Sequence, residues 1–401
     1  MATTRKRGNS YQIRVSCGYD TEGHQVVQTM TWKPAEGMTK KQIEKELQRQ
    51  AILFEEKCLK GQITANIKFQ DFAEQWFREY AEVNLRHNSH DRMLDLRPRV
   101  YEAIGHLRMD KITSRHIQQF VNDLILNGKN KKNGKPLSQK TASHHLSFIS
   151  DVFSYALRLE MLTDNPCCRV TIPKGIKKEK DIYTLEEAEQ ILTCLDEEPL
   201  MYRAFFNLAV YSGFRRGEML GLEWKDVDWE HCVISVRRTS CYTPKRGMYT
   251  DTTKTPKSQR SLKFPAFVMD LLRQLKEQQE KDKAEIGSKW VETDRLFIKW
   301  NGEALFVSQP YGWFQRFCKR HGIRFCDIHS LRHFYASALI NEGVDAATVS
   351  SALGHSTITT TTSIYCQVFD QAQARAGDAI SSALDFKHKK KKNDQQMQAA
   401  G

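Results

Sequence analysis

The 401-residue sequence has little glycine and proline and no long apolar run. Its 21 Gly and 10 Pro are too few for a fibrous or wholly disordered chain. No apolar stretch approaches the roughly 18 residues that a membrane span needs, and the basic N-terminus lacks the apolar segment of a signal peptide. We therefore expect a cytosolic protein without a membrane partner and with about two to four domains.

Several chemical motifs are also missing. None of the ten cysteines forms a CxxC pair, so we expect free thiols in a reducing compartment rather than a zinc site. No nucleotide-binding GxxxxGKS or GxxxxGKT loop occurs, and no acidic cluster suited to two Mg²⁺ ions stands out. These absences predict a protein without a metal ion or another cofactor.

Positive charge is what the sequence has in excess. It carries 61 Lys and Arg against 48 Asp and Glu, which gives a formal net charge of +13. This balance indicates a polyanionic partner, either a nucleic acid or an anionic membrane surface.

The pattern of residues changes along the chain and predicts a multidomain fold, mainly α-helical with small β-sheets. Residues 10–33 alternate apolar and polar side chains as strands do, and a helix follows over 39–61. Later, strands over 231–264 interrupt a second helical region. We expect four parts: a small β-sheet-plus-helix module over 1–61, a helical bundle-like domain over 66–172, a mixed α/β domain over 180–386 and a basic, disordered tail over 387–401.

Two motifs that could bind phosphate lie in the first half of the mixed domain. Ser212-Gly213-Phe214-Arg215 follows an apolar helix, and Glu218 comes three residues later. An arginine after a glycine turn can be held rigidly beside an anion, although a structural Arg–Glu pair would have the same pattern. Lys254 lies between two short predicted strands, so we expect it near a hairpin tip, where it either contacts a phosphate or is simply solvated.

Three further features follow in the second half. His329 and Arg332 are three residues apart, so they share a helix face and can donate to one phosphate. Leu353-Gly354-His355 reads as a glycine turn, and Tyr365 follows His355 by ten residues. Taken singly, these are also the marks of a solvated helix start, a capped helix end and a core tyrosine.

Taken together, the order Arg, Lys, His-x-x-Arg, Gly-His, Tyr resembles the tyrosine recombinase, or phage integrase, family over 180–386. Ser212 stands where that family often has Thr, and Tyr365 comes ten positions after His355, where many bacterial chromosome-resolving members have an offset of nine. The resemblance implies a site-specific DNA recombinase that excises and integrates a mobile element. The alternatives are a type IB topoisomerase-like enzyme and a DNA-binding architectural protein whose catalytic residues are idle.

The resemblance also implies a role for each residue. Tyr365 is the expected nucleophile and forms a 3′-phosphotyrosine link. Arg215 and Arg332 hold the non-bridging oxygens, Lys254 protonates the leaving 5′-oxygen, and His355 binds the scissile phosphate. His329 handles protons around the nucleophile, and Glu218 is a structural support for the turn at Arg215. Such chemistry rests on positioning and charge stabilisation, and a covalent intermediate allows rejoining without ATP.

The remaining parts resemble accessory DNA-binding domains. Residues 66–172 resemble the core-binding domain, and 1–61 resembles the arm-binding domain of integrases from Gram-positive conjugative transposons. We expect a bacterial, nucleoid-associated protein that binds core-type and arm-type sites on double-stranded DNA and forms a homotetramer on synapsed DNA, with an excisionase as a candidate partner. In the arm-binding domain, Gln12 and Arg14 would face a major groove and Arg5, Lys6 and Arg7 would form a flexible arm. The expected phosphate contacts of the core-binding domain are Lys129, Lys131, Lys132, Lys135 and Lys140.

Overall fold

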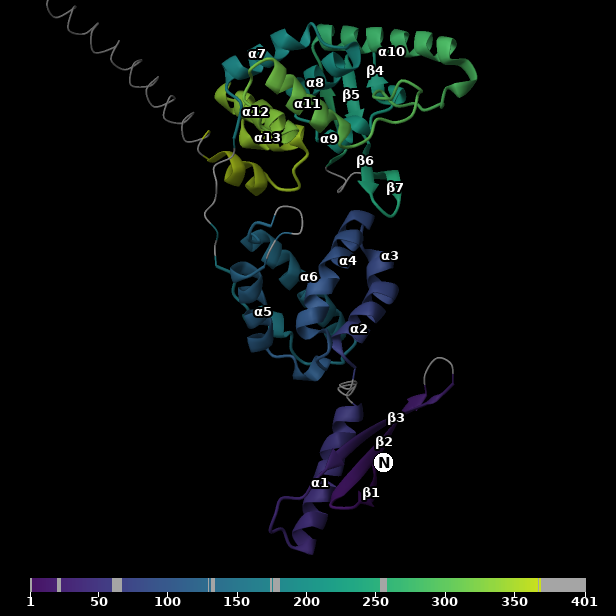
Figure 1. Ribbon diagram of the computed structural model, residues 1–401, viewed down its shortest axis with the longest axis vertical. Coiled ribbons are helices and arrows are strands. Elements are labelled where there is room, and N and C mark those ends of the chain that lie inside the picture. Colours follow the sequence, from purple (N-terminus) through teal and green to yellow (C-terminus); the bar gives the residue numbers. More distant parts are fainter. Residues whose placement is uncertain are drawn as a thin grey trace, which may run out of the picture. The chain divides into compact units, whose positions relative to one another are not determined.

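The computed structural model describes residues 2–19, 23–59, 67–128, 130, 134–173, 175, 181–252, 258–366 and 368. Contacts along the chain divide it into two compact units, Met1–Lys177 and Lys178–Gly401. Figure 1 shows the elements of each unit. Among the described residues, no helix combines the length and the apolar character that crossing a membrane requires.

A three-stranded antiparallel sheet and one helix form the N-terminal part of the first unit. The strands are β1 (Thr3–Arg7), β2 (Ser10–Tyr19) and β3 (Gln25–Trp32), in the order β1-β2-β3. Helix α1 (Lys40–Leu59) packs against β2 and β3, as Figure 1 shows. Ile13 and Val15 of β2 and Phe54 of α1 are buried between them, because alternate strand residues point to the same face.

The expected flexible arm at Arg5, Lys6 and Arg7 is wrong, because these residues form strand β1. Arg5 pairs with Gln12 and Lys6 with Tyr11. Gly8, with φ of +58°, makes the tight turn from β1 to β2 possible. This exposed edge strand contains two threonines and three basic residues, so it lacks the apolar alternation that identifies a strand in sequence.

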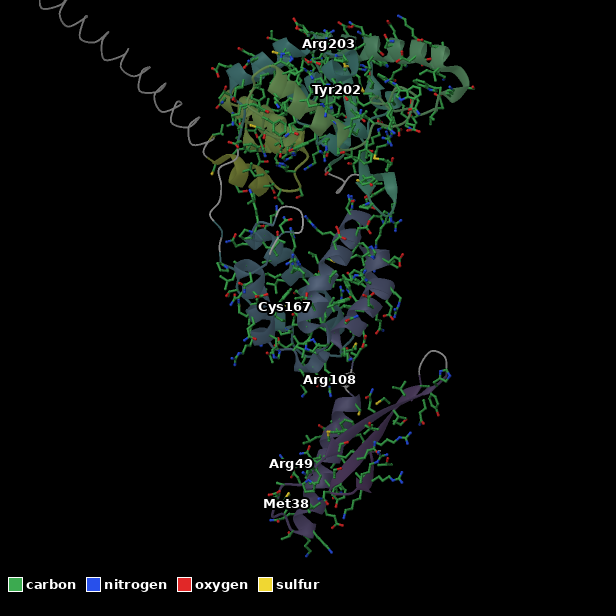
Figure 2. All side chains as sticks on the ribbon, viewed as in Figure 1. Met38, Arg49, Arg108, Cys167, Tyr202 and Arg203 are labelled. Atoms are coloured by element: carbon green, nitrogen blue, oxygen red, sulfur yellow. The ribbon has the colours of Figure 1, made fainter. Side chains whose placement is uncertain are left out.

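Helices dominate the rest of the first unit, as expected. They are α2 (Phe69–Trp76), a π-helical turn (Phe77–Ala81), α3 (Glu82–Asn84), α4 (His87–Val100), a second π-helical turn (Tyr101–Gly105), a 3₁₀ turn (Met109–Lys111), α5 (Ser114–Leu126), α6 (Gln139–Arg158) and a final 3₁₀ turn (Pro166–Arg169). The aromatic stripe of α2 is core: Phe72 and Trp76 are fully buried and pack with Phe148 and other residues of α6. Cys167, labelled in Figure 2, belongs to the same core.

The second unit is a helical domain with two small sheets. Its helices are α7 (Leu185–Leu195), α8 (Leu200–Ser212), α9 (Arg216–Leu220), α10 (Ala266–Ile286), α11 (Gln309–Arg320), α12 (Ile328–Asn341), α13 (Ala346–Leu353) and a helix over 358–366, with 3₁₀ turns at Trp224–Asp226 and Gly287–Lys289. The strands are β4 (Val227–Asp228), β5 (Val233–Val236), β6 (Arg238–Thr243), β7 (Gly247–Thr252) and β8 (Arg260–Lys263).

Helix α8 is the centre of this unit. Eight of its residues are buried, and it packs against α10 and α12. Near its start, Tyr202, labelled in Figure 2, stacks on Trp313 of α11 with ring centres 4.1 Å apart. The apolar run of α8 therefore fixes the end of the helix, at Ser212, in the interior of the unit.

The sheet topology changes the expectation for Lys254. Strands β4, β5 and β8 form one antiparallel sheet, and β6 and β7 form another. The strands on either side of Lys254, β7 and β8, are therefore not paired with each other. The segment that carries Lys254 joins two sheets, so the predicted hairpin tip is wrong, and the residue itself lies outside the described part of the chain.

Candidate active site

The site begins where α8 ends. The hydroxyl of Ser212 donates to the Leu208 carbonyl at 2.6 Å and accepts from the Phe214 N–H at 3.1 Å. Serine therefore supplies the hydroxyl that a threonine would supply at this position. Gly213 follows in the left-handed region, with φ of +58°, and turns the chain toward α9.

Only glycine fits at position 213. A Cβ atom there would lie 2.6 Å from the Tyr335 ring and 3.1 Å from Leu353. The positive φ adds a second restriction, because residues with a Cβ are strained in that region. Helices α12 and α13 can therefore approach this turn closely.

Arg215 caps α9 and is held by Glu218. The Arg215 N–H donates to Glu218 Oε2 at 2.9 Å, and its Nη1 donates to Oε1 at 2.7 Å. The Arg215 side chain is 39% exposed, whereas that of Glu218 is 5% exposed. Burial alone would raise the pKa of Glu218, but the attraction of Arg260 and Arg215 outweighs it and leaves that pKa below its ordinary value. Glu218 is thus a buried anion that orients a partly exposed guanidinium.

Arg332 lies in the first turns of α12 and is 2% exposed. Its Nη1 donates to the Gly213 carbonyl at 2.6 Å, and its Nη2 donates to the Leu353 carbonyl at 2.7 Å. Burial, with the nearby charge of Arg215, lowers the pKa of Arg332 to about 9. One guanidinium therefore joins the glycine turn after α8 to the end of α13.

His355 follows the glycine turn that ends α13. Its Nδ1 lies 2.8 Å from the hydroxyl of Thr361, which is fully buried. Burial, together with the charges of Arg332 and Arg215, lowers the pKa of His355 to about 4. The imidazole is therefore neutral at neutral pH, and it is oriented by the helix that carries Tyr365.

Tyr365 is 1% exposed, which places its phenol inside the unit. Its Oη lies 2.7 Å from Nδ1 of His333, the residue after Arg332. Burial raises the pKa of Tyr365 to about 12, although the charge of Arg332 opposes that rise. In this conformation the phenol is protonated at neutral pH and shielded from solvent.

The structure brings together Arg215, Arg332, His355 and the supporting Glu218 around the ends of α8 and α13. His329 is exposed on α12, and its ring contacts that of His333, with centres 4.8 Å apart. Lys254 belongs to residues 253–257, which are not described.

The residues predicted to bind DNA lie in the first unit. Arg5, Lys6, Arg7 and Arg14 are exposed, and Gln12 is half-buried. Lys140 lies in the first turn of α6, and Lys135 precedes that helix. Lys129, Lys131 and Lys132 fall outside the described residues.

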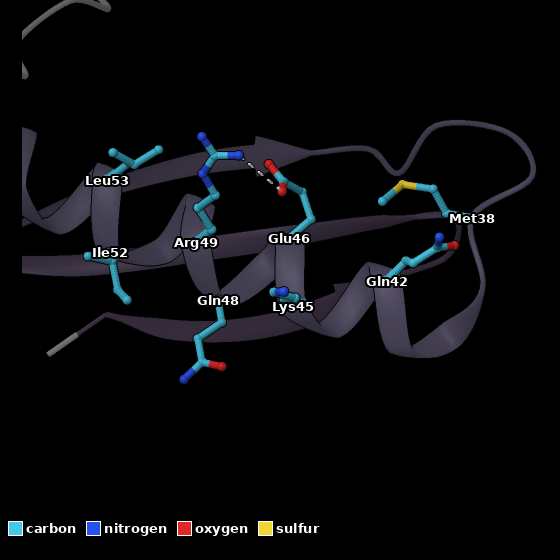
Figure 3. A pocket seen from close by; sticks show the side chains of 8 residues that line it. All are labelled: Met38, Gln42, Lys45, Glu46, Gln48, Arg49, Ile52 and Leu53. Carbon is cyan, nitrogen blue, oxygen red and sulfur yellow. Dashed lines mark ion pairs between the residues drawn. The ribbon is translucent and has the colours of Figure 1, made fainter.

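A shallow hollow lies beside α1, with Lys45, Arg49 and Ile52 on its wall (Figure 3). None of the residues predicted to bind DNA lines it.

Two buried residues of the site were missed in the sequence. Arg260 of β8 donates from Nη2 to Glu218 Oε2 at 2.9 Å, and His333 contacts Tyr365. These contacts span 42 and 32 residues, so no local spacing indicates them. The only signal was that His333 adjoins Arg332, one helical turn after His329.

A metal site is not evident in the geometry. Within the described ranges, no three His, Cys, Asp or Glu side chains are grouped so that they could hold a metal ion.

Sequence comparisons identify both units. The phage integrase family matches residues 182–372, and the phage integrase N-terminal SAM-like domain matches residues 68–125. A tyrosine recombinase XerC-like protein of Caldanaerobacter subterraneus subsp. tengcongensis is 27% identical over 92% of this chain and 95% of its own length. The ICEBs1 integrase of Bacillus subtilis strain 168 is 24% identical over 96% of this chain and 100% of its own length.

Solved structures show the same fold. The Tn1549 transposon integrase, in complex with a circular intermediate DNA, matches 78% of this chain and 100% of that chain, with a TM-score of 0.62 and 20% identity. A lambda integrase tetramer bound to a Holliday junction matches 90% of this chain and 96% of that chain, with a TM-score of 0.52 and 16% identity. The motifs, the fold and the family matches agree, and the chain belongs to the phage integrase family of tyrosine-type site-specific DNA recombinases.

Proposed function

We propose that this recombinase cuts DNA with Tyr365 and holds the scissile phosphate with Arg215, Arg332 and His355. The Tyr365 oxygen attacks phosphorus, the bond from phosphorus to the 5′-oxygen breaks, and a 3′-phosphotyrosine link forms. The leaving 5′-oxygen takes a proton, which we assign to Lys254. Because the phosphodiester energy is retained in the tyrosyl link, a 5′-hydroxyl from a second strand can reverse the step and rejoin the DNA.

One observation carries this proposal: two guanidiniums and one imidazole from three separate motifs meet around Gly213 and Leu353. Fixed positive groups of this kind stabilise the charge that builds on the equatorial oxygens during phosphoryl transfer. Arg215, the more exposed guanidinium, can reach a phosphate without losing its bond to Glu218.

Cleavage also requires a change in the position of Tyr365. A phenol that is 1% exposed and bonded to His333 cannot contact a phosphodiester in DNA. The helix over 358–366 must therefore shift, which breaks the contact with His333. The exposed ring of His329 contacts the ring of His333. His329 is therefore our candidate for the group that receives the phenolic proton.

We assign the remaining modules to DNA binding. The open face of the N-terminal sheet carries Arg5, Gln12 and Arg14, because Arg5 pairs with Gln12 and Arg14 lies two residues farther along β2. A face of this kind fits a major groove at an arm-type site. Lys6 pairs with Tyr11 on the opposite face, and we assign it and Arg7 to phosphate contacts. The helical region would bind core-type DNA through Lys135, Lys140 and the undescribed Lys129, Lys131 and Lys132.

We assign the physiological reaction to a mobile element. The similarity to the ICEBs1 and Tn1549 integrases supports excision and integration of a conjugative element, with four protomers that exchange strands through a Holliday junction. We also propose an excisionase as a directional partner, and a nucleoid-associated location in a bacterial cell.

The test uses a nicked suicide substrate from the element's own end, incubated with the purified protein in EDTA. We expect a covalent protein–DNA adduct on a denaturing gel. Tyr365→Phe should bind the same DNA and form no adduct, because it lacks the attacking oxygen. Tyr183→Phe is the matched control, since Tyr183 is another buried tyrosine of this unit. An adduct that persists in Tyr365→Phe would contradict the assignment of the nucleophile, and supercoil relaxation without synapsis would indicate a topoisomerase.

A further inference from the structure

The outer face of α1 carries apolar side chains that remain exposed. Ile52 is 53% exposed and Leu53 is 41% exposed, and both line the hollow drawn in Figure 3. Met38 lines the other end of the same hollow, and polar and charged side chains lie between the two ends (Figure 3). A single exposed apolar side chain is ordinary, but a group of them along one hollow indicates a contact surface.

This face of α1 points away from the sheet. Leu47 and Phe54 are among the residues of α1 that are buried against the strands. Lys45 and Ile52 each stand two residues before one of them, which places them about half a turn away around the helix. The open face of the sheet, which we assign to DNA, lies on the far side of the same module. A partner can therefore occupy the α1 hollow while the sheet holds DNA.

The charges and apolar groups along the hollow are complementary to themselves. We consider two copies of α1 that run antiparallel about a twofold axis passing between positions 45 and 46. Each side chain on one copy then faces a suitable one on the other, and the facing pairs are Met38 with Leu53, Gln42 with Arg49, and Lys45 with Glu46.

The charged pair lies at the centre of this arrangement, where the twofold axis makes it occur twice. Glu46 is 30% exposed on its side chain and lies 3.7 Å from Arg49 Nη1 of its own chain. It can accept a second cation from a partner, because a carboxylate has two oxygens and about four acceptor positions. The apolar side chains lie at both ends, so the pairing brings Met38 of one copy to Ile52 and Leu53 of the other.

We propose that the outer face of α1 pairs antiparallel with the same face of a second copy, and so joins two DNA-bound N-terminal modules back to back. The proposal rests on the function assigned above to the sheet and adds a contact between protomers. Because the two open sheet faces then point in opposite directions, the pair holds two DNA segments rather than neighbouring sites on one straight duplex.

The pairing surface is one face of one helix, so free chains should associate weakly. Protomers that DNA already holds near one another have an effective concentration on the order of 1 mM, at which a weak contact is occupied. The contact should therefore act mainly when several protomers are assembled on DNA.

The experiment uses the full-length protein and two duplexes, each with one arm-type site defined by footprinting and no core-type site. One duplex carries biotin and the other a fluorophore, and bridging is measured as fluorescence retained on streptavidin. Sedimentation equilibrium of the DNA-free protein at high concentration provides a second readout. We expect wild type to bind each duplex, to bridge the two and to show weak association without DNA.

A charge exchange within one chain tests the central pair. Lys45→Glu and Glu46→Lys should each lower bridging at least about tenfold, because each variant places like charges opposite one another at two symmetric positions. The double variant Lys45→Glu/Glu46→Lys restores opposite charges and should return bridging to within about threefold of wild type. Affinity for one duplex should stay within about threefold in all three variants, since this face points away from the DNA.

Leu53→Gln tests the apolar end of the hollow and should lower bridging severalfold. Leu126→Gln is the matched control, because Leu126 is also an exposed leucine near the end of a helix, 77% exposed on α5, and does not line the hollow. It should bridge as wild type does.

The outcomes separate this pairing from other occupants of the hollow. If Lys45→Glu weakens and Glu46→Lys strengthens binding to one duplex, the hollow contacts DNA and the pairing is wrong. If wild type binds both duplexes but neither bridges them nor associates, or if the double variant is not rescued, the pairing is also overturned. If wild type does not bind the arm-type duplex, the DNA assignment of the sheet fails, and the sedimentation of the charge-exchange variants still decides the pairing.

Discussion

The arginines of the N-terminal sheet and two arginines near the Gly213 turn, Arg332 and Arg260, lie in opposite environments. Arg5, Arg7 and Arg14 are exposed on strands β1 and β2. Arg332 is 2% exposed, and Arg260 is held by three protein acceptors. The same side chain can therefore serve two purposes. Exposed guanidiniums can attract a polyanion through a field that salt screens, and buried ones fix geometry that salt hardly changes.

This difference predicts how the two regions respond to mutation. Loss of an exposed arginine should weaken binding and leave chemistry intact, because the contact is similar in the ground state and the transition state. Loss of a buried arginine should damage chemistry and leave most of the affinity, because its contribution grows as charge develops on the phosphate.

The largest effect should come from Arg332→Ala. We expect single-turnover adduct formation to fall about 10³-fold while DNA affinity changes by less than about tenfold. The reason is that this variant removes a charge that we assign to the scissile phosphate and also the link between the Gly213 and Leu353 carbonyls. Single-turnover cleavage and filter binding on the same duplex provide the measurement. If affinity fell as far as cleavage, the contrast between the two regions would not hold.

The next effect compares two glycines with the same backbone angle. Gly213 and Gly8 both have φ of +58°, but a Cβ atom would collide with Tyr335 only at Gly213 and meets nothing within 4 Å at Gly8. Alanine should therefore destabilise the second unit by about 1–3 kcal/mol more than it destabilises the first. Calorimetric unfolding of Gly213→Ala and Gly8→Ala would show this. Equal costs would mean that the turn at Gly213 can relax.

A smaller effect is expected for Arg14→Gln. Affinity for arm-type DNA should fall severalfold, and the slope of log K against log salt should decrease by about 1, because one positive charge facing the DNA is lost. Cleavage of a core-type suicide substrate should not change. Binding titrations at several salt concentrations give the slope, and Lys45→Gln, on α1 rather than the sheet, serves as the control. A change in the core cleavage rate would show that the two regions are coupled.

The last prediction is that His355 should not titrate near neutral pH. Because the pKa of His355 is lowered to about 4, its imidazole should stay neutral from about pH 8 to pH 5 in the free protein. Since the folded pKa lies below the unfolded one, His355 stabilises the fold fully above about pH 6.5, and that contribution is lost as the pH falls toward 4. NMR of the imidazole protons, with His355→Gln for assignment, would detect a normal titration if the site were open.

The sequence predicted much of this molecule because its signals were local. The alternation of apolar and polar residues over 10–33 correctly predicted strands β2 and β3. The spacing of Arg215 and Glu218 indicated their contact, because both lie within one helical turn. The helical periodicity predicted over 66–172 and the strand pattern predicted over 231–264 were also confirmed, because both patterns depend on residues that are close in sequence.

What the sequence could not predict depends on contacts between distant segments. Strand pairing decides whether the neighbours of Lys254 form a hairpin, and pairing is not visible in either strand alone. The contact of His333 with Tyr365 and the hydrogen bond from Arg260 to Ala352, 92 residues away, arise only when the helices pack. Strand β1 was missed because all five of its residues are exposed, so they show no alternation of apolar and polar side chains.

The environment of Arg332 has a consequence for the stability of the whole unit. Arg332 donates to two carbonyl oxygens, and among the described residues no ion pair joins it to a carboxylate. These dipoles and the more distant charge of Glu218 compensate its buried charge only in part. Such a charge opposes folding until an anion arrives. DNA should therefore act as a folding ligand as well as a substrate: the recombinase should resist heat better on its target than alone, and the phosphate that is to be cut should itself complete the fold.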